Sequence, residues 1–145
     1  MLWLRAARRR VPDHDVADTR RKLMGASGIV WGGIRTERFD ESVAFFRDVI
    51  GLTVDEQQSG FASFKMPNGD KFEVFGPEDH DHDFFTTGPV IGFGVDDVEA
   101  IRSRLEGAGV EFVAPTQAEG EYRWAHFRGP DGLIFEIAGR NDNSS

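Results

Sequence analysis

One seven-residue pattern, Pro-x-Gly-x-x-Phe-Glu, occurs twice in the 145-residue chain. Its fixed positions are Pro67, Gly69, Phe72 and Glu73 in the first copy and Pro130, Gly132, Phe135 and Glu136 in the second, an offset of 63 residues throughout. Proline presets φ for a turn and glycine accepts a positive φ, so each copy predicts a hairpin turn followed by a strand. The repeat restricts the chain to folds with two equivalent halves, each of which places a glutamate on an apolar strand.

A helix is predicted upstream of each copy, over residues 39–52 and 96–110. Apolar side chains recur there at helical spacing: Val43, Phe46, Val49 and Ile50 in the first helix, and Val98, Ile101, Leu105 and Ala108 in the second. We expect Asp40 to cap the first helix and Asp96 or Asp97 to cap the second, since aspartate accepts hydrogen bonds from the free amides of a first turn. Each amphipathic helix needs a sheet face to cover.

Strands are predicted before each helix, over 28–36 and 89–97, because apolar residues alternate there with period two. With the strands that follow each helix, the chain predicts an α+β fold of two βαβββ modules, helices outside and the sheets curling into a cup. The predicted boundaries are a leader (1–27), one domain (28–140) and a polar tail (141–145). Within the domain, module one is 28–77, the linker is 78–88 and module two is 89–140.

The formal net charge is −8, although the first 24 residues carry seven Lys or Arg against three Asp. The acidic remainder argues against nucleic acid or an anionic membrane as a partner. No apolar stretch reaches the roughly 18–20 residues of a membrane span, and the run before the first arginines is too short for a secretory signal. We therefore expect a cytoplasmic protein. The basic leader is interpreted as a disordered extension, with Met24 as an alternative start, or as a nucleic-acid-binding arm.

Four phrases carry a resemblance to a known family: "SVAFFRDVIGL", "NGDKFEVFGPE", "GFGVDDVEAIRSRLEGAGVEF" and "RGPDGLIFEI". Over residues 29–138 the chain resembles the vicinal oxygen chelate superfamily, which includes glyoxalases, bleomycin resistance proteins, fosfomycin-modifying enzymes and extradiol dioxygenases. The resemblance implies the curled-sheet fold of that superfamily, a small-molecule ligand, and a homodimer as in many relatives of this size. It does not select a reaction, because this fold hosts isomerases, dioxygenases, thiol transferases and plain binders.

The resemblance also implies a position for a metal. Metal-using relatives take two ligands from each module, and Glu73 and Glu136 match the two glutamate positions. The other two positions, usually histidine, are Trp31 and Val90, whose side chains cannot bind a metal. A divalent metal held by Glu73 and Glu136 therefore stays one interpretation, and a pair of metal-free carboxyl groups, one acting as a general base, is the other. No nucleotide cofactor is expected.

Further candidates face the same cup. His126 is a candidate acid, base or substitute ligand beside Glu136, because an imidazole near a carboxylate is tuned to work near neutral pH. The predicted substrate-binding residues are Trp31, Arg35, Val90, Gly92 and Trp124. The two tryptophans can form walls for stacking, and an arginine at the cup mouth can hold an anion. For each residue, plain packing or solvation is the alternative interpretation.

The segment "PEDHDHDFF" at 77–85 places His80 and His82 among acidic residues. We interpret it as a polar linker between the modules, since alternating acidic side chains prefer solvent. Adventitious cation binding is the weaker alternative.

Two hypotheses of function follow. The first is a glyoxalase- or dioxygenase-like enzyme acting on a small oxygenated metabolite, in which Glu73, Glu136 and His126 bind a weak metal or transfer protons, as in enolisation of a carbonyl compound. The second is a binder of the bleomycin resistance type, which sequesters a drug or metabolite without turnover. An acidic surface suits a cationic ligand in that case.

Overall fold

The computed structural model describes residues 25–140, so the predictions for most of the leader and for the polar tail lie outside the described residues. The elements follow in the order β1 (Gly28–Arg35), α3 (Phe39–Ala44), η1 (Phe45–Ile50), β2 (Thr53–Gln58), β3 (Phe61–Lys65), β4 (Lys71–Phe75), β5 (Val90–Gly94), α4 (Val98–Gly107), β6 (Gln117–Glu119), β7 (Tyr122–Arg128) and β8 (Ile134–Arg140). Each half of this order reads βαβββ, as the repeat predicts. None of the described helices is long and apolar enough to cross a membrane.

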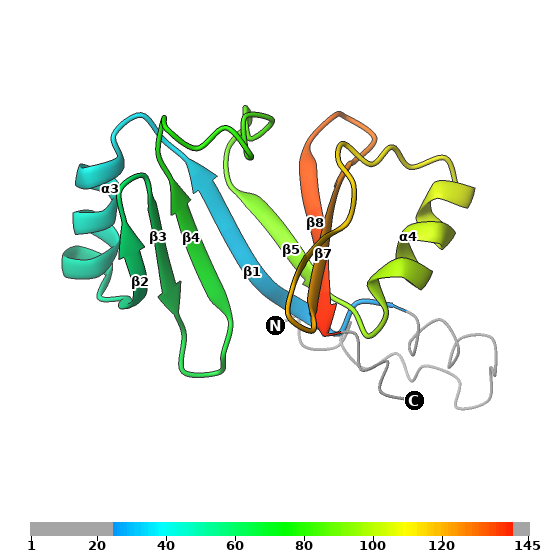
Figure 1. Cartoon of the computed structure of the whole chain (residues 1–145), viewed down its shortest axis with the longest axis horizontal. Coiled ribbons are helices and arrows are strands. Elements are labelled where there is room, and N and C mark those ends of the chain that lie inside the picture. The colour runs from blue at the N-terminus through cyan, green and yellow to red at the C-terminus, as the bar shows by residue number, and fades with distance from the viewer. Residues whose placement is uncertain (1–24, 141–145) are drawn as a thin grey trace, which may run out of the picture.

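The strands form one eight-stranded sheet in the order β2-β3-β4-β1-β5-β8-β7-β6. β1 and β5 pair antiparallel in the middle and join the two modules, while β4 and β8 each run parallel to the first strand of their module. Figure 1 shows the sheet curved, with the helices of the two modules on its outer side at opposite ends. The α+β fold with a curled mixed sheet, predicted from the repeat, is confirmed.

The two Pro-x-Gly turns connect β3 to β4 and β7 to β8. Gly69 has a φ of 92° and Gly132 a φ of 85°, a left-handed conformation that strongly favours glycine. Because each turn is followed by an equivalent strand, Glu73 and Glu136 lie on β4 and β8, next to β1 and β5 respectively. The turns thus bring both glutamates to the centre of the sheet.

The structure of the second helix agrees more closely with the sequence prediction than that of the first. The Asp97 side chain accepts a hydrogen bond of 3.0 Å from the Ala100 amide, so the predicted cap is confirmed. In the first helix Asp40 lies inside the first turn, and Arg38 occupies the cap position. The helix continues as the π-helical turn η1, whose wider i→i+5 hydrogen bonding changes the helical phase. Val49, expected in the core, is therefore 71% exposed.

Three apolar clusters hold the fold together. One lies under the first helix and contains Val43, Ala62, Phe64 and Val74. A second lies under α4 and contains Val95, Val98, Ile101, Ala125 and Ile137. The third fills the concave side with Trp31, Phe75, Phe85, Val90 and Ile134. Since Phe85 belongs to the linker, that segment packs onto the sheet, at the end where Figure 1 shows the chain crossing from β4 to β5.

Candidate functional site

Trp31 lies at the centre of the concave side, where two glycines make room for it. A Cβ atom on Gly33 would come within 2.2 Å of the indole ring, and one on Gly92 would lie 3.0 Å from the Trp31 Cβ. Both distances are shorter than side chains tolerate, so the "WGG" sequence and Gly92 let the indole lie flat on the sheet. The register of β1 and β5 shifts between Ile29 and Trp31, an irregularity of the kind that re-aims side chains near functional sites.

Glu73, on β4, faces Trp31 on the neighbouring strand β1. The indole Nε1 donates a hydrogen bond of 2.9 Å to Glu73 Oε1. Burial raises the pKa of Glu73, the bond from Trp31 opposes this shift, and the nearby Glu136 adds to it. Glu73 is thus a largely buried carboxyl group with one donor that favours its charged form.

Glu136 and His126 form a second buried pair. They lie directly opposite each other on β8 and β7 and are only 4% and 3% exposed. His126 Nε2 lies 2.8 Å from Glu136 Oε2, yet it makes no hydrogen bond of acceptable direction. Burial raises the pKa of Glu136 to about 8 and lowers the pKa of His126 to about 4. Burial therefore favours the uncharged form of each group, a protonated carboxyl group beside a neutral imidazole, although the two lie at a distance short enough for an ion pair.

A cavity of about 230 Å³ brings these groups together. It is lined by Trp31, Phe61, Lys71, Glu73, Phe75, His82, Glu119, Tyr122, Trp124 and Glu136. A second hollow of about 210 Å³ adjoins it and is lined by Asp81, His82, Phe84, Ala114, Gln117, Trp124 and His126. Of the sequence-predicted residues, Glu73, Glu136, Trp31 and Trp124 thus line one cavity, and His126 lines the adjoining hollow.

The other predicted substrate-binding residues take different positions. Arg35 binds the linker: its guanidinium lies 3.2 Å from the Asp83 carboxylate and donates to the Asp79 carbonyl oxygen. Val90 packs in the core cluster with Trp31 and is 1% exposed. A Cβ on Gly92 would lie 3.2 Å from Glu136 Oε1, so this glycine lies between Trp31 and the Glu136 carboxyl group.

Sequence interpretation missed several residues that line the cavity: Phe61, Lys71, Phe75, His82, Glu119 and Tyr122. The interpretation of 78–88 as a solvated polar linker is wrong for His82 and Phe85, because Phe85 is buried and the His82 ring stacks on Phe75 at 3.8 Å between centroids. The signal in the sequence was the apolar pair Phe84 and Phe85 directly after the histidines, which a fully solvated linker would not need.

The donor set does not fit the metal centre that the family resemblance implies. Two of the four matching positions are Trp31 and Val90, and Trp31 directs an N–H donor at Glu73, where a metal would need a lone pair. Within residues 25–140, no group of three or more His, Cys, Asp or Glu side chains is arranged to hold a metal ion.

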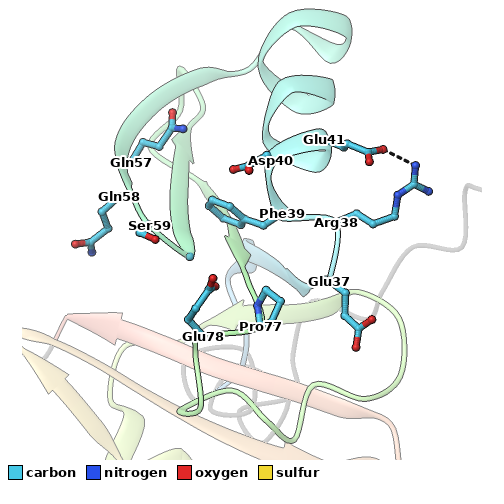
Figure 2. A pocket seen from close by; sticks show the side chains of 11 residues that line it. Glu37, Arg38, Phe39, Asp40, Glu41, Gln57, Gln58, Ser59, Pro77 and Glu78 are labelled. Carbon is cyan, nitrogen blue, oxygen red and sulfur yellow. Dashed lines mark hydrogen bonds and ion pairs between the residues drawn. The ribbon is translucent and has the colours of Figure 1, made fainter.

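A wider hollow, about 790 Å³, lies elsewhere. Figure 2 shows it between the start of α3, the β2–β3 turn and the end of module one. Its lining is mostly exposed and acidic, with Glu37, Asp40, Glu41 and Glu78 against Arg38, which pairs with Glu41. It contains neither of the repeated glutamates, so we place the candidate site in the smaller central cavity.

Comparison with known proteins agrees with this architecture. The model of the Glyoxalase/Bleomycin resistance protein/Dioxygenase superfamily matches residues 28–137, and the chain belongs to this superfamily. No curated protein matches the chain significantly.

Solved structures share the fold. The Mn(II)-bound glyoxalase from Novosphingobium aromaticivorans is 24% identical with a TM-score of 0.63, over 81% of this chain and 40% of that one. The methylmalonyl-CoA epimerase from Mycobacterium tuberculosis is 19% identical with a TM-score of 0.61, over 92% and 95% of the two chains. A superfamily member from Vibrio splendidus 12B01 is 17% identical with a TM-score of 0.57, over 74% and 95%. At these identities the similarity extends to the fold, and function has to be argued from the cavity.

Proposed function

We propose that the protein is an enzyme that moves a proton next to the carbonyl group of a small, uncharged oxygenated metabolite. Glu73 is the base and Glu136 is the acid. The observation that carries this proposal is the unequal environment of two equivalent glutamates. Burial raises the pKa of both glutamates, but Glu73 receives an N–H hydrogen bond that opposes this shift, whereas burial raises the pKa of Glu136 to about 8. Environments that separate the protonation of two carboxyl groups in one cavity are typical of an acid and base pair.

The proton balance of this reaction closes without a further reactant. The Glu73 carboxylate takes a proton from the carbon next to the carbonyl, and the Glu136 carboxyl group gives its proton to the carbonyl oxygen, which yields the enol. In the reverse direction the enol returns its oxygen-bound proton to Glu136, and Glu73 returns a proton to carbon. General acid and base groups of this kind contribute roughly 10²–10⁴-fold each to such steps. Burial lowers the pKa of His126, which favours a proton on the Glu136 carboxyl group 2.8 Å away.

The dimensions and charges of the cavity limit the substrate. A volume of 230 Å³ corresponds to roughly eight water molecules at their liquid volume, so an enclosed ligand is a compound of few heavy atoms. The Glu73 carboxylate disfavours an anionic group next to it, although Lys71 in the same lining offsets part of that charge. Aromatic walls from Trp31, Tyr122 and Trp124 favour an uncharged organic molecule.

Solvent hydrogen exchange tests the proposal. The protein, treated with EDTA, is incubated in D2O with hydroxyacetone, dihydroxyacetone or acetoin, and loss of the α-proton signal is followed by ¹H NMR. We expect exchange above the buffer rate, at least a hundredfold slower in Glu73→Gln and unchanged in the control Glu121→Gln, whose side chain is exposed outside the cavity. Equal rates in wild type and Glu73→Gln would refute the assignment of the base.

A binder without turnover is the second candidate, favoured by the replacement of both family histidine positions by Trp31 and Val90. A carboxylate beside an indole face suits a small organic cation, and a cavity of this volume would enclose only one end of a bleomycin-type glycopeptide. This candidate predicts that tetramethylammonium raises the melting temperature of wild type and not of Glu73→Gln, with no exchange of any carbonyl compound.

A further inference from the structure

We propose that His82, oriented by Asp79, selects α-hydroxy carbonyl compounds by accepting a hydrogen bond from their hydroxyl group. This inference rests on the proposed function, because it specifies the substrate class of the same cavity. It assigns a binding role to a histidine of the segment between the modules, where the sequence pattern indicated only solvated charge.

The Asp79 carboxylate sets the orientation of the His82 ring. His82 Nδ1 lies 3.0 Å from both carboxylate oxygens of Asp79, and both side chains are mostly buried, at 19% and 17% exposure. A carboxylate accepts only, so Nδ1 carries the proton of the neutral ring. Nε2 is then left with a free lone pair, since the hydrogen bonds of the ring found within residues 25–140 are those of Nδ1 to Asp79. A carboxylate behind a histidine fixes the tautomer in this way at many functional sites.

The ring lies at the boundary of the cavity. His82 and Trp124 line both the 230 Å³ cavity and the adjoining hollow, so they form the wall between the two. The ring lies flat on Phe75 with an angle of 19° between the planes, and its centroid is 6.1 Å from that of His126. His82 is also close enough to Glu73 for a positive charge on its ring to lower the pKa of that carboxyl group. A ligand in the cavity therefore meets Glu73, Glu136 and His82 together.

The linker holds His82 in a fixed position. The His82 amide donates to Asp79 Oδ1, and the Phe85 amide donates to the His82 carbonyl oxygen. Arg35 donates to the carbonyl oxygens of Asp79 and Pro77 and pairs with Asp83. Phe85 is buried against Trp31. Arg35, predicted from the sequence as an anion anchor, thus serves to position the Asp79–His82 pair.

The chemistry follows from these three points. Glu136 is the donor for the carbonyl oxygen and Glu73 is the base at carbon, so a neighbouring hydroxyl group of the ligand needs a further acceptor. His82 Nε2 supplies it. A site with an acceptor at this place disfavours an analogue that lacks the hydroxyl hydrogen, because that analogue cannot make the hydrogen bond.

The test compares hydroxyacetone with methoxyacetone, in which a methyl group replaces the hydroxyl hydrogen. We expect wild type to exchange hydroxyacetone about tenfold faster or more, the discrimination that one hydrogen bond supplies. His82→Phe keeps a ring to stack on Phe75 but has no acceptor, so the rate ratio should fall toward one. His80→Phe is the matched control, since His80 lies two positions away with a 77% exposed side chain, and the ratio should stay as in wild type. An unchanged ratio in His82→Phe would overturn the proposal.

A binding measurement separates this proposal from the proposed function. In protein labelled with ¹⁵N-histidine, hydroxyacetone should shift the His82 Nε2 resonance, and methoxyacetone should do so only at about tenfold higher concentration. Absence of exchange with this shift present would refute the enzyme and keep His82 as a selectivity residue of a binder. Exchange in wild type without a shift at His82 would refute the role of His82 and keep the enzyme.

Discussion

The protonated state of Glu136 predicts how the stability of the protein depends on pH. Its pKa is about 8 in the folded protein, against an ordinary value of 4.5. The folded state therefore keeps a proton that the unfolded chain releases, and the free energy of unfolding falls as pH rises from 4.5 to 8. For His126 the sign is opposite: with its pKa lowered from 6.5 to about 4, stability falls as pH drops from 6.5 to 4. Between pH 4.5 and 6.5 the two contributions cancel.

The substitution Glu136→Gln isolates the contribution of the glutamate. Glutamine does not titrate, so the free energy of unfolding of the variant should no longer fall as pH rises above 6.5. It should still increase as pH rises from 4 to 6.5, because His126 is unchanged. A difference of 3.5 between the folded and ordinary pKa of Glu136, at 1.36 kcal/mol per unit, gives about 5 kcal/mol. The stability of Glu136→Gln relative to wild type should therefore increase by about 5 kcal/mol between pH 4.5 and pH 8. Titration of Glu136 and His126 alone should lower the free energy of unfolding of wild type by about 2 kcal/mol between pH 6.5 and pH 8.

The assay is urea unfolding followed by tryptophan fluorescence at pH 4.5, 5.5, 6.5, 7.5 and 8.5, at constant ionic strength. Groups other than Glu136 titrate in both proteins and cancel in the difference. Glu121→Gln is the control, since its exposed carboxylate should give a difference that changes little with pH. If the difference between Glu136→Gln and wild type stays within about 1 kcal/mol over this range, Glu136 is charged in the folded protein and cannot be the acid.

Two further predictions concern Trp31 and metals. Trp31→Phe removes the donor to Glu73, so the free energy of unfolding at pH 7 should fall by about 1–3 kcal/mol, because a buried carboxylate is left unpaired. The loss should be smaller in a protein that already carries Glu73→Gln. Equal losses in both backgrounds would show that the cost comes from packing. EDTA-stripped protein should keep its melting temperature on titration with Mn²⁺, Zn²⁺ or Ni²⁺, because Trp31 and Val90 stand at ligand positions of metal-using relatives; a rise that Glu73→Gln abolishes would contradict this.

The fold could be predicted because local signals agree with the duplication. The Pro-x-Gly turns, the spacing of apolar residues and the Asp97 cap each depend on a few neighbouring residues, and each is present in the structure. The phase of the first helix could not be predicted beyond Phe45, because the π-helical turn has no signature in the pattern of apolar residues. The exposed Val49 is the result.

Part of the candidate site could be predicted because the duplication places equivalent residues in equivalent positions. The repeat pointed to Glu73 and Glu136, and the pairing of β7 with β8 sets His126 opposite Glu136. The position of His82 depends on contacts distant in sequence: Phe75 below the ring and Arg35 holding the linker backbone. Acidic residues around His82 indicated solvent, and only the packed structure reveals that Phe85 pulls the segment onto the sheet.

The two modules share one strand boundary, β1 against β5, and this has a consequence for dividing the chain. The residues from Thr86 to Pro89 are exposed, and exposed loops of this kind tolerate a break. A cut there leaves Glu73 and His82 on one fragment and Glu136 and His126 on the other, each fragment with an inner strand edge that lacks its partner. Neither fragment alone holds both carboxyl groups, so recovery of hydrogen exchange on mixing would report their reassociation, and the protein would serve as a split reporter.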